Sequence, residues 1–244
     1  MKWKKYGPWW GRFTSALMAT VCGIVFTFGI ARCDTRRTRS HFIRTNEVVA
    51  MCSIQKSIVE LDKISKPLIE EMPTVKSVVK MYPDSLKYVS DEAANIFISS
   101  FTNFAFYTFD NNAERMFLGS SDMWMYAKSR SEIAAISELF SALNLAQQLW
   151  SEIDNTLSQI TNIKLVEIVG QEIAGQKALK IFFNSKSDVW TYNALIIKAE
   201  LFQQTMTRLH QYYDKVYDSL GITENEIKNC TSDFGDFFYS FDSE

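Results

Sequence analysis

The stretch that comes closest to a reactive or ligand-binding motif lies in residues 170–177. A phosphate-binding loop needs two glycines five residues apart, a lysine directly after the second glycine, and then a Ser or Thr for magnesium. Gly170 and Gly175 have the required spacing, but Gln176 takes the place of the lysine, Lys177 comes one position late, and Ala178 follows it. We therefore expect no nucleotide site, and we interpret the two glycines as a break between helices.

Histidines and paired carboxylates give no better basis for chemistry. The chain has two histidines, His41 and His210, which are too few for most triad or metal arrangements. We interpret His210 as a partly exposed helix residue and assign His41 no role. The pairs Glu70–Glu71 and Asp91–Glu92 are adjacent, so on a helix their side chains point about 100° apart. We expect solvated charges at helix ends, and we predict no catalytic residue, no metal and no cofactor.

The longest uncharged stretch near the start of the chain lies between Arg12 and Arg32. Its nineteen residues, FTSALMATVCGIVFTFGIA, would form a helix of about 30 Å, which matches the hydrocarbon core of a bilayer. We predict that residues 13–31 are an uncleaved signal-anchor, a single transmembrane helix that holds the protein in the lipid bilayer. The alternatives are a cleaved signal peptide, an organelle presequence and a buried helix.

Small residues recur every four positions within this stretch, at Ser15, Ala19 and Gly23. Such a stripe lets two membrane helices approach closely and predicts self-association, although small residues are common in membrane helices in any case. Basic residues are nearly balanced on the two sides of the stretch, so the positive-inside rule gives almost no preference. The side of the membrane that holds the soluble domain is left undecided, with a slight lean to the extracytoplasmic side.

Charge divides the chain into a basic beginning and an acidic remainder. Nine of the 26 Lys and Arg residues but only one of the 28 Asp and Glu residues lie in residues 1–44, which leaves 17 basic and 27 acidic residues in 45–244. This acidic excess would repel a phosphate backbone, so we expect no nucleic-acid partner. The basic residues near the start are suited to anionic lipid head groups.

The four cysteines form no CxxC pair, and they favour reduced thiols over a disulfide framework. They are Cys22, Cys33, Cys52 and Cys230.

Apolar periodicity predicts helices through most of residues 45–230. A seam of eight apolar residues steps by three and four and ends just before Gly221, a suitable C-cap. The seam comprises Leu195, Ala199, Phe202, Met206, Leu209, Tyr213, Val216 and Leu220. We interpret it as a core helix of the protein's own bundle, with an intermolecular coiled coil as the alternative. Beyond it, Thr223 and Glu226 predict a capping box for a short terminal helix.

A second long helix is expected over residues 131–169, since no Gly or Pro lies between Gly119 and Gly170. Its apolar positions form two adjoining stripes, so it must pack against more than one neighbour. One stripe is Leu139, Ala142, Ala146, Leu149, Ile153, Ile160 and Ile163, and the other is Ile136, Phe140, Leu143, Trp150 and Leu157. Residues 164–170 could alternatively form a strand.

Elsewhere, the uncharged run over residues 93–109 carries several polar residues, so it predicts a buried core helix rather than a second membrane span. Pro67, Pro73 and Pro83 predict helix starts or stops.

The chain is expected to be all-α: a transmembrane helix followed by an elongated antiparallel bundle of four or five helices. We divide it into a basic tail (1–12), the anchor (13–31), a basic juxtamembrane segment (32–44), the helical domain (45–230) and an acidic-aromatic tail (231–244). Aromatic residues of that tail could dock in a partner's groove, or they could pack back and seal the end of the bundle, which we favour. They are Phe234, Phe237, Phe238, Tyr239 and Phe241.

These features favour a membrane-anchored protein with a non-catalytic role in assembly or protein interaction, through a protein partner or self-association. A helical sensor that binds a small ligand is the first alternative, and an enzyme with unidentified residues is the second.

Overall fold

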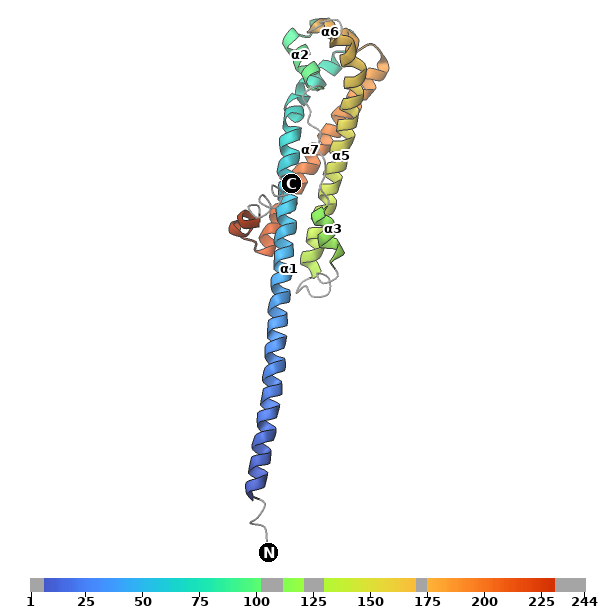
Figure 1. Ribbon diagram of the computed structural model, residues 1–244. Helices are drawn as coiled ribbons and strands as arrows, with labels where there is room; N and C mark the ends of the chain where they lie inside the picture. The colour runs from blue at the N-terminus through green and yellow to red at the C-terminus, as the bar shows by residue number, and fades with distance from the viewer. Residues whose placement is uncertain (1–6, 102–111, 121–129, 170–174, 231–244) are drawn as a thin grey trace, which may run out of the picture.

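Three long helices build the protein, as a computed structural model shows (Figure 1). The structure describes residues 7–101, 112–120, 130–169 and 175–230, and within these the side chains of all but 7–37 and 165–169. The long helices are α1 (Gly7–Lys80), α5 (Arg130–Val169) and α7 (Lys186–Leu220). The shorter elements are η1 (Leu86–Tyr88), α2 (Asp91–Ser99), α3 (Asn112–Gly119) and α6 (Gln176–Phe182), and residues 224–230 are also helical. The described residues form no strand, which confirms the all-α class.

Helix α7 runs antiparallel to both other long helices. Lys76 of α1 pairs with Glu200 of α7, and Asp62 of α1 pairs with His210 of α7. Residue numbers therefore rise along α7 as they fall along α1. Ion pairs between α5 and α7 follow the same antiparallel order. Helices α1 and α5 therefore run in parallel (Figure 1). The predicted antiparallel arrangement is therefore right for α7 with α1 and for α7 with α5, but it is wrong for α1 with α5.

The predicted helix boundaries at Pro67 and Pro73 are wrong, because both prolines lie inside α1, a single helix of 74 residues. A proline inside a helix removes one backbone hydrogen bond and costs about 3 kcal/mol. Both prolines are exposed, whereas Leu68, Met72 and Val75 on the other side of the helix are buried. Burial of these side chains along the bundle offsets the local cost.

The predicted juxtamembrane segment is also part of α1, since the helix continues without interruption through residues 32–44. Ile43 is already in the core, so packing begins within this segment. Within the residues whose side chains are described, no helix is both long and apolar enough to cross a membrane. Residues 13–31 lie outside those side chains, although their backbone belongs to α1, and the anchor stays a prediction.

The long helix predicted over residues 131–169 is confirmed as α5, and most of its two apolar stripes are buried. Ile163 is an exception at 67% exposed. In the last turns of α5, Thr161 and Lys164 make the tertiary contacts instead. The hydroxyl of Thr161 donates to the carbonyl of Phe101 at 2.7 Å. The strand alternative is wrong for residues 164–169, which are helical.

The seam on α7 is confirmed as part of the protein's own core. Seven of its residues are buried, and Leu220 is partly buried at the end. The seam packs against α1 and α5 of the same chain, so an intermolecular coiled coil through these residues is wrong. Gly221 adopts the left-handed conformation with φ of 58°, as a C-cap requires. The capping box is also confirmed, because Thr223 and Glu226 each bind the other's backbone N–H.

Aromatic rings fill the core at the end of the bundle where α2, α6 and α7 meet. Phe97 is fully buried, with its ring centroid 5.0–5.6 Å from those of its neighbours. The neighbouring rings are Phe101, Phe182, Phe183 and Tyr192. The core helix predicted over residues 93–109 is only partly confirmed, because α2 ends at Ser99 and residues 102–109 lie outside the described part.

A partly buried ion pair holds the same end together. The Nζ atom of Lys164 on α5 lies 3.0 Å from the Oδ1 atom of Asp188 on α7, and it also donates to the carbonyl of Ile181 on α6 at 3.1 Å. One ammonium group thus connects three helices.

Candidate functional site

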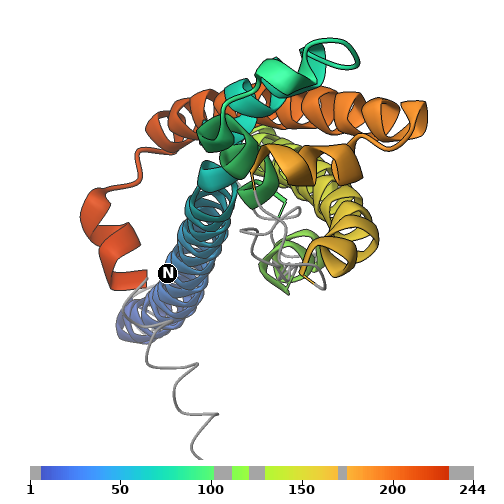
Figure 2. The same cartoon turned by 90° about the horizontal axis from the view of Figure 1, so that it is seen from above.

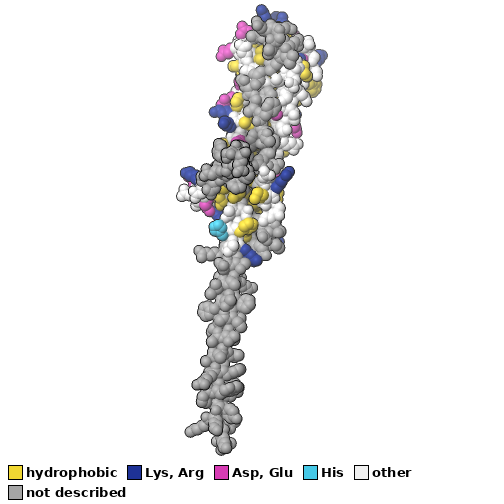
Figure 3. Space-filling view, in the orientation of Figure 1, with side chains coloured by type: hydrophobic (Ala, Val, Ile, Leu, Met, Phe, Trp, Pro, Cys, Tyr) yellow, Lys and Arg dark blue, Asp and Glu magenta, His cyan; other side chains and the backbone are white. Residues whose placement is uncertain are grey.

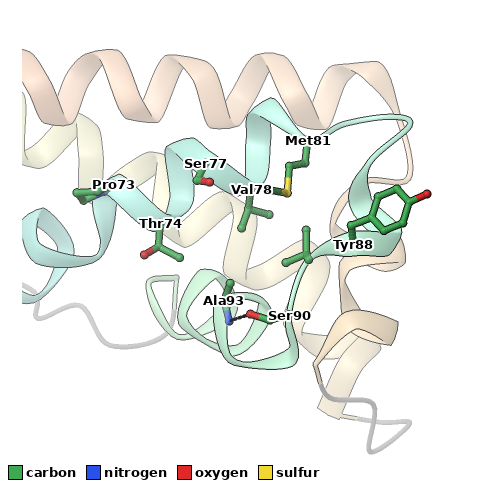
Figure 4. A pocket seen from close by; sticks show the side chains of 9 residues that line it. Pro73, Thr74, Ser77, Val78, Met81, Tyr88, Ser90 and Ala93 are labelled. Atoms are coloured by element: carbon green, nitrogen blue, oxygen red, sulfur yellow. Dashed lines mark hydrogen bonds between the residues drawn. The ribbon is translucent and has the colours of Figure 1, made fainter.

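A pocket lies where the end of α1 meets η1 and α2, and its volume is about 470 Å³ (Figure 4). Thr74 and Val78 point from α1 toward Ala93 on α2, while Tyr88 stands at the edge with 73% of its surface exposed. The lining residues are Pro73, Thr74, Ser77, Val78, Met81, Tyr88, Val89, Ser90 and Ala93.

The local sequence explains how this pocket forms. Helix α1 ends at Lys80, and the chain reverses through η1. Ser90 then caps α2, because its side chain accepts a hydrogen bond from the backbone N–H of Ala93 at 3.2 Å. The cap fixes the start of α2 beside the last turns of α1, with Val89 buried at the junction. The turn after α1 and the cap of α2 therefore bring the lining residues together.

The pocket is lined by apolar side chains and by the hydroxyl groups of Thr, Ser and Tyr residues. Its lining carries no carboxylate, imidazole, amine or thiol. Thr74 and Ser77 each bring a hydroxyl group to the lining. Apolar walls with a few hydroxyls suit a small uncharged ligand. The sequence offered no signal for this pocket, because its residues come together only through the turn after α1.

The structure describes the second half of the stretch that resembles a phosphate loop, from Gly175 onward. Gly175 has φ of 62° and precedes α6, so the predicted helix break is confirmed there, while Gly170 lies outside the described residues. The N–H of Gln176 donates to Asp91 Oδ1 at 2.9 Å, and the N–H of Gly175 donates to Asn95 at 3.1 Å. The carboxylate of Asp91 thus binds an N–H in the first turn of α6, and Lys177 is exposed.

The histidines and acid pairs occupy separate places. His210 is half-exposed, as predicted, and its Nε2 atom lies 2.9 Å from Asp62 Oδ2. Asp91 lies in the first turn of α2, as predicted. Glu71 does not lie at a helix end, because α1 continues past it. It is partly buried, it accepts a hydrogen bond from Ser99, and burial raises the pKa of its carboxyl.

Glu47 on α1 is another buried carboxylate that the sequence did not single out. Burial raises the pKa of Glu47, and repulsion from Glu132 adds to this effect, whereas Arg44 opposes it. Neither Glu47 nor Glu71 lines the pocket. Among the described side chains, no group of three His, Cys, Asp or Glu residues could hold a metal ion.

Arg44 forms a clamp between α1 and the C-terminal helix of residues 224–230. Its Nε and Nη2 atoms each lie 3.0 Å from a carboxylate oxygen of Glu226, and its guanidinium also donates to the carbonyls of Leu220 and Gly221 at 2.8 Å. The C-terminal helix lies on the side of α1 away from α5 (Figures 1 and 2). Sequence reasoning found the capping role of Glu226 but could not find a partner so distant in the chain.

Acid is expected to open this clamp. The Arg44 guanidinium, helped by the N–H of Thr223, lowers the pKa of Glu226 from 4.5 to about 2. A lowered carboxyl pKa stabilises the docked state above about pH 4.5, and the contribution is lost as the pH falls toward 2. The protection factors of the amides of residues 222–230, which compare hydrogen exchange with the intrinsic rate at each pH, should therefore fall over that range, while those of α7 stay high.

The Arg44→Met variant should show the lowered protection factors of residues 222–230 already at neutral pH. Equal exchange in both proteins at pH 7 would contradict the role of the clamp.

The remaining predicted sites are outside what the structure describes. The side chains of Ser15, Ala19 and Gly23 are not described, and the tail residues Phe234, Phe237, Phe238, Tyr239 and Phe241 lie beyond the last described residue. No family model, curated protein or solved structure matches this chain. Fold and pocket together define an elongated all-α bundle with an uncharged pocket beside the end of α1.

Proposed function

We propose that this chain is a single-pass membrane-anchored helical protein with a non-catalytic role in assembly or protein interaction. The course of α1 supports this proposal, because residues 13–31 and the bundle belong to one unbroken helix. From residue 31 to its end at Lys80, that helix extends about 75 Å at 1.5 Å per residue. An anchor at residues 13–31 would therefore hold the far end of the bundle well away from the bilayer.

An apolar stripe on the outer side of α7 is the observation that carries the interaction role. Trp190, Ile197 and Leu201 are 78%, 65% and 48% exposed. Their spacing of seven and four residues places them within about 40° of one another around the helix, on a side away from the buried seam. Figure 3 draws one face of the molecule, where acidic and basic side chains both accompany scattered apolar ones. A helical stripe of this kind fits an apolar strip on a partner helix.

Photo-crosslinking in native membranes tests both parts of the proposal. The full chain should remain in the membrane pellet after a carbonate wash, since a transmembrane helix is not extracted by alkali. A photoreactive amino acid at position 197 should then give a discrete crosslinked product. Mass spectrometry of that product distinguishes a second copy of this chain from another protein.

The matched control is the same amino acid at position 203, where Gln203 is exposed but lies away from the stripe. It should give no discrete product. Equal crosslinking at the two positions, or release of the full chain by carbonate, would contradict the proposal.

A second candidate function is a sensor that binds a small neutral ligand, and the pocket between α1 and α2 favours it. Its volume of about 470 Å³ is in the range of ligand sites. Benzyl alcohol, a neutral aromatic alcohol, should cause a saturable shift of the Met81 methyl resonance. Ala93→Phe would fill the space opposite Thr74 and should abolish that shift with little change in melting temperature. A shift that persists in Ala93→Phe would exclude this pocket.

A further inference from the structure

Two cysteine thiols meet between α1 and the C-terminal helix. Cys52 lies on α1 and Cys230 ends the helix of residues 224–230, and their side chains are in hydrogen-bonding contact. Both are thiols and both are buried, with 5% and 9% of their surfaces exposed. Residues distant in sequence thus bring two oxidisable sulfur atoms together in one place.

The surrounding contacts hold this pair in position. Arg44 lies about two turns before Cys52 on α1 and grips Glu226, one turn before Cys230. Ile222 and Ile227 are buried on the same segment. The ion pair therefore holds the C-terminal helix against α1, and the two buried isoleucines stabilise the packing of this segment on the bundle. The approach of the two thiols follows from that docking.

We propose that Cys52 and Cys230 are a reversible dithiol–disulfide couple that fastens the C-terminal helix to α1. The oxidant is a low-molecular-weight disulfide of the glutathione class. One thiolate attacks that disulfide and releases one small thiol, and the second thiolate then displaces the other small thiol. Two protein thiols and one small disulfide thus give one protein disulfide and two small thiols, with two electrons passing to the oxidant.

The docked state and the open state have different roles in this exchange. Burial raises the pKa of the Cys52 thiol, although the contact with Cys230 and the charge of Lys56 oppose the shift. A buried thiol with a raised pKa is a poor nucleophile, so attack on a bulky disulfide requires the helix to swing away. Closure of the protein disulfide instead requires docking, because only docking brings the two sulfur atoms together.

The equilibrium can be measured on the full chain in detergent micelles, with Cys22 and Cys33 replaced by Ser. The protein is equilibrated in glutathione buffers of increasing oxidised fraction, quenched with acid, alkylated and mapped by mass spectrometry. We expect a Cys52–Cys230 linked peptide that forms with a single midpoint and disappears with dithiothreitol. The melting temperature of the oxidised form should rise by about 5–10 °C, since the link closes a long loop. Mixed glutathione disulfides without the linked peptide, or a fall in melting temperature, would overturn the proposal.

Arg44→Met tests whether docking positions the thiols. We expect the equilibrium constant for the disulfide to fall about tenfold, because the C-terminal helix spends less time against α1. Arg208→Met is the matched control, as Arg208 is exposed on α7, and it should leave the constant unchanged. Equal constants in the two variants would overturn the proposal even if a disulfide forms.

Discussion

The Leu209→Asp variant is expected to unfold the helical bundle. Leu209 is 1% exposed and lies in the α7 seam between α1 and α5. Replacing it with Asp removes a buried apolar side chain and places a carboxylate in the core without a cationic partner. The combined loss is at least about 5 kcal/mol, comparable with the whole stability of an ordinary domain. Circular dichroism should show a large loss of helicity at 25 °C and no cooperative melting.

Leu201→Asp provides a matched control on the same helix. Leu201 is 48% exposed, so the same chemical change there adds a solvated charge. Helicity and melting temperature should stay close to those of the unmodified chain. A Leu209→Asp variant that melts like Leu201→Asp would show that the seam is not buried.

The second large effect is expected from Phe97→Ala at the aromatic end of the bundle. Phe97 is fully buried and contacts the rings of Phe101, Phe182, Phe183 and Tyr192. Truncation leaves a cavity and removes several ring pairs, so the free energy of unfolding should fall by about 3–5 kcal/mol. Urea denaturation should show a lower midpoint with a similar slope.

Tyr88→Ala is the control for this prediction, because Tyr88 is an aromatic residue of the same region that is 73% exposed. Its removal should change the free energy of unfolding by less than about 1 kcal/mol. Similar losses in the two variants would show that Phe97 is not at the centre of the core.

Long periodic patterns were the features that could be predicted from residue order. The α7 seam, the extent of α5 and the Gly221 cap are all confirmed. Each depends on contacts that repeat every three or four residues, so neighbours in sequence are also neighbours on the helix surface. The box between Thr223 and Glu226 is confirmed for the same reason, since a cap joins residues within one turn.

Local rules failed where distant packing outweighed them. Pro67 and Pro73 should end helices by backbone sterics, yet α1 passes through both because one side of it is buried. Ile163 continues an apolar stripe but points outward, since Thr161 and Lys164 make the tertiary contacts there. At the prolines the free energy of burial exceeds a local preference worth a few kcal/mol. At Ile163 a tertiary hydrogen bond and an ion pair decide which side of α5 faces the bundle.

The sequence by itself therefore determined the helical class, the two long helices of the core and the lack of a phosphate-loop pattern. Only the tertiary structure decided the parallel order of α1 and α5, the pocket between α1 and α2, the Arg44–Glu226 clamp and the meeting of Cys52 with Cys230. The physical reason is the distance in sequence between the interacting residues. A helix and its caps follow from interactions within a few residues. These sites depend instead on how whole helices turn and dock, which the spacing of residues within one helix does not specify.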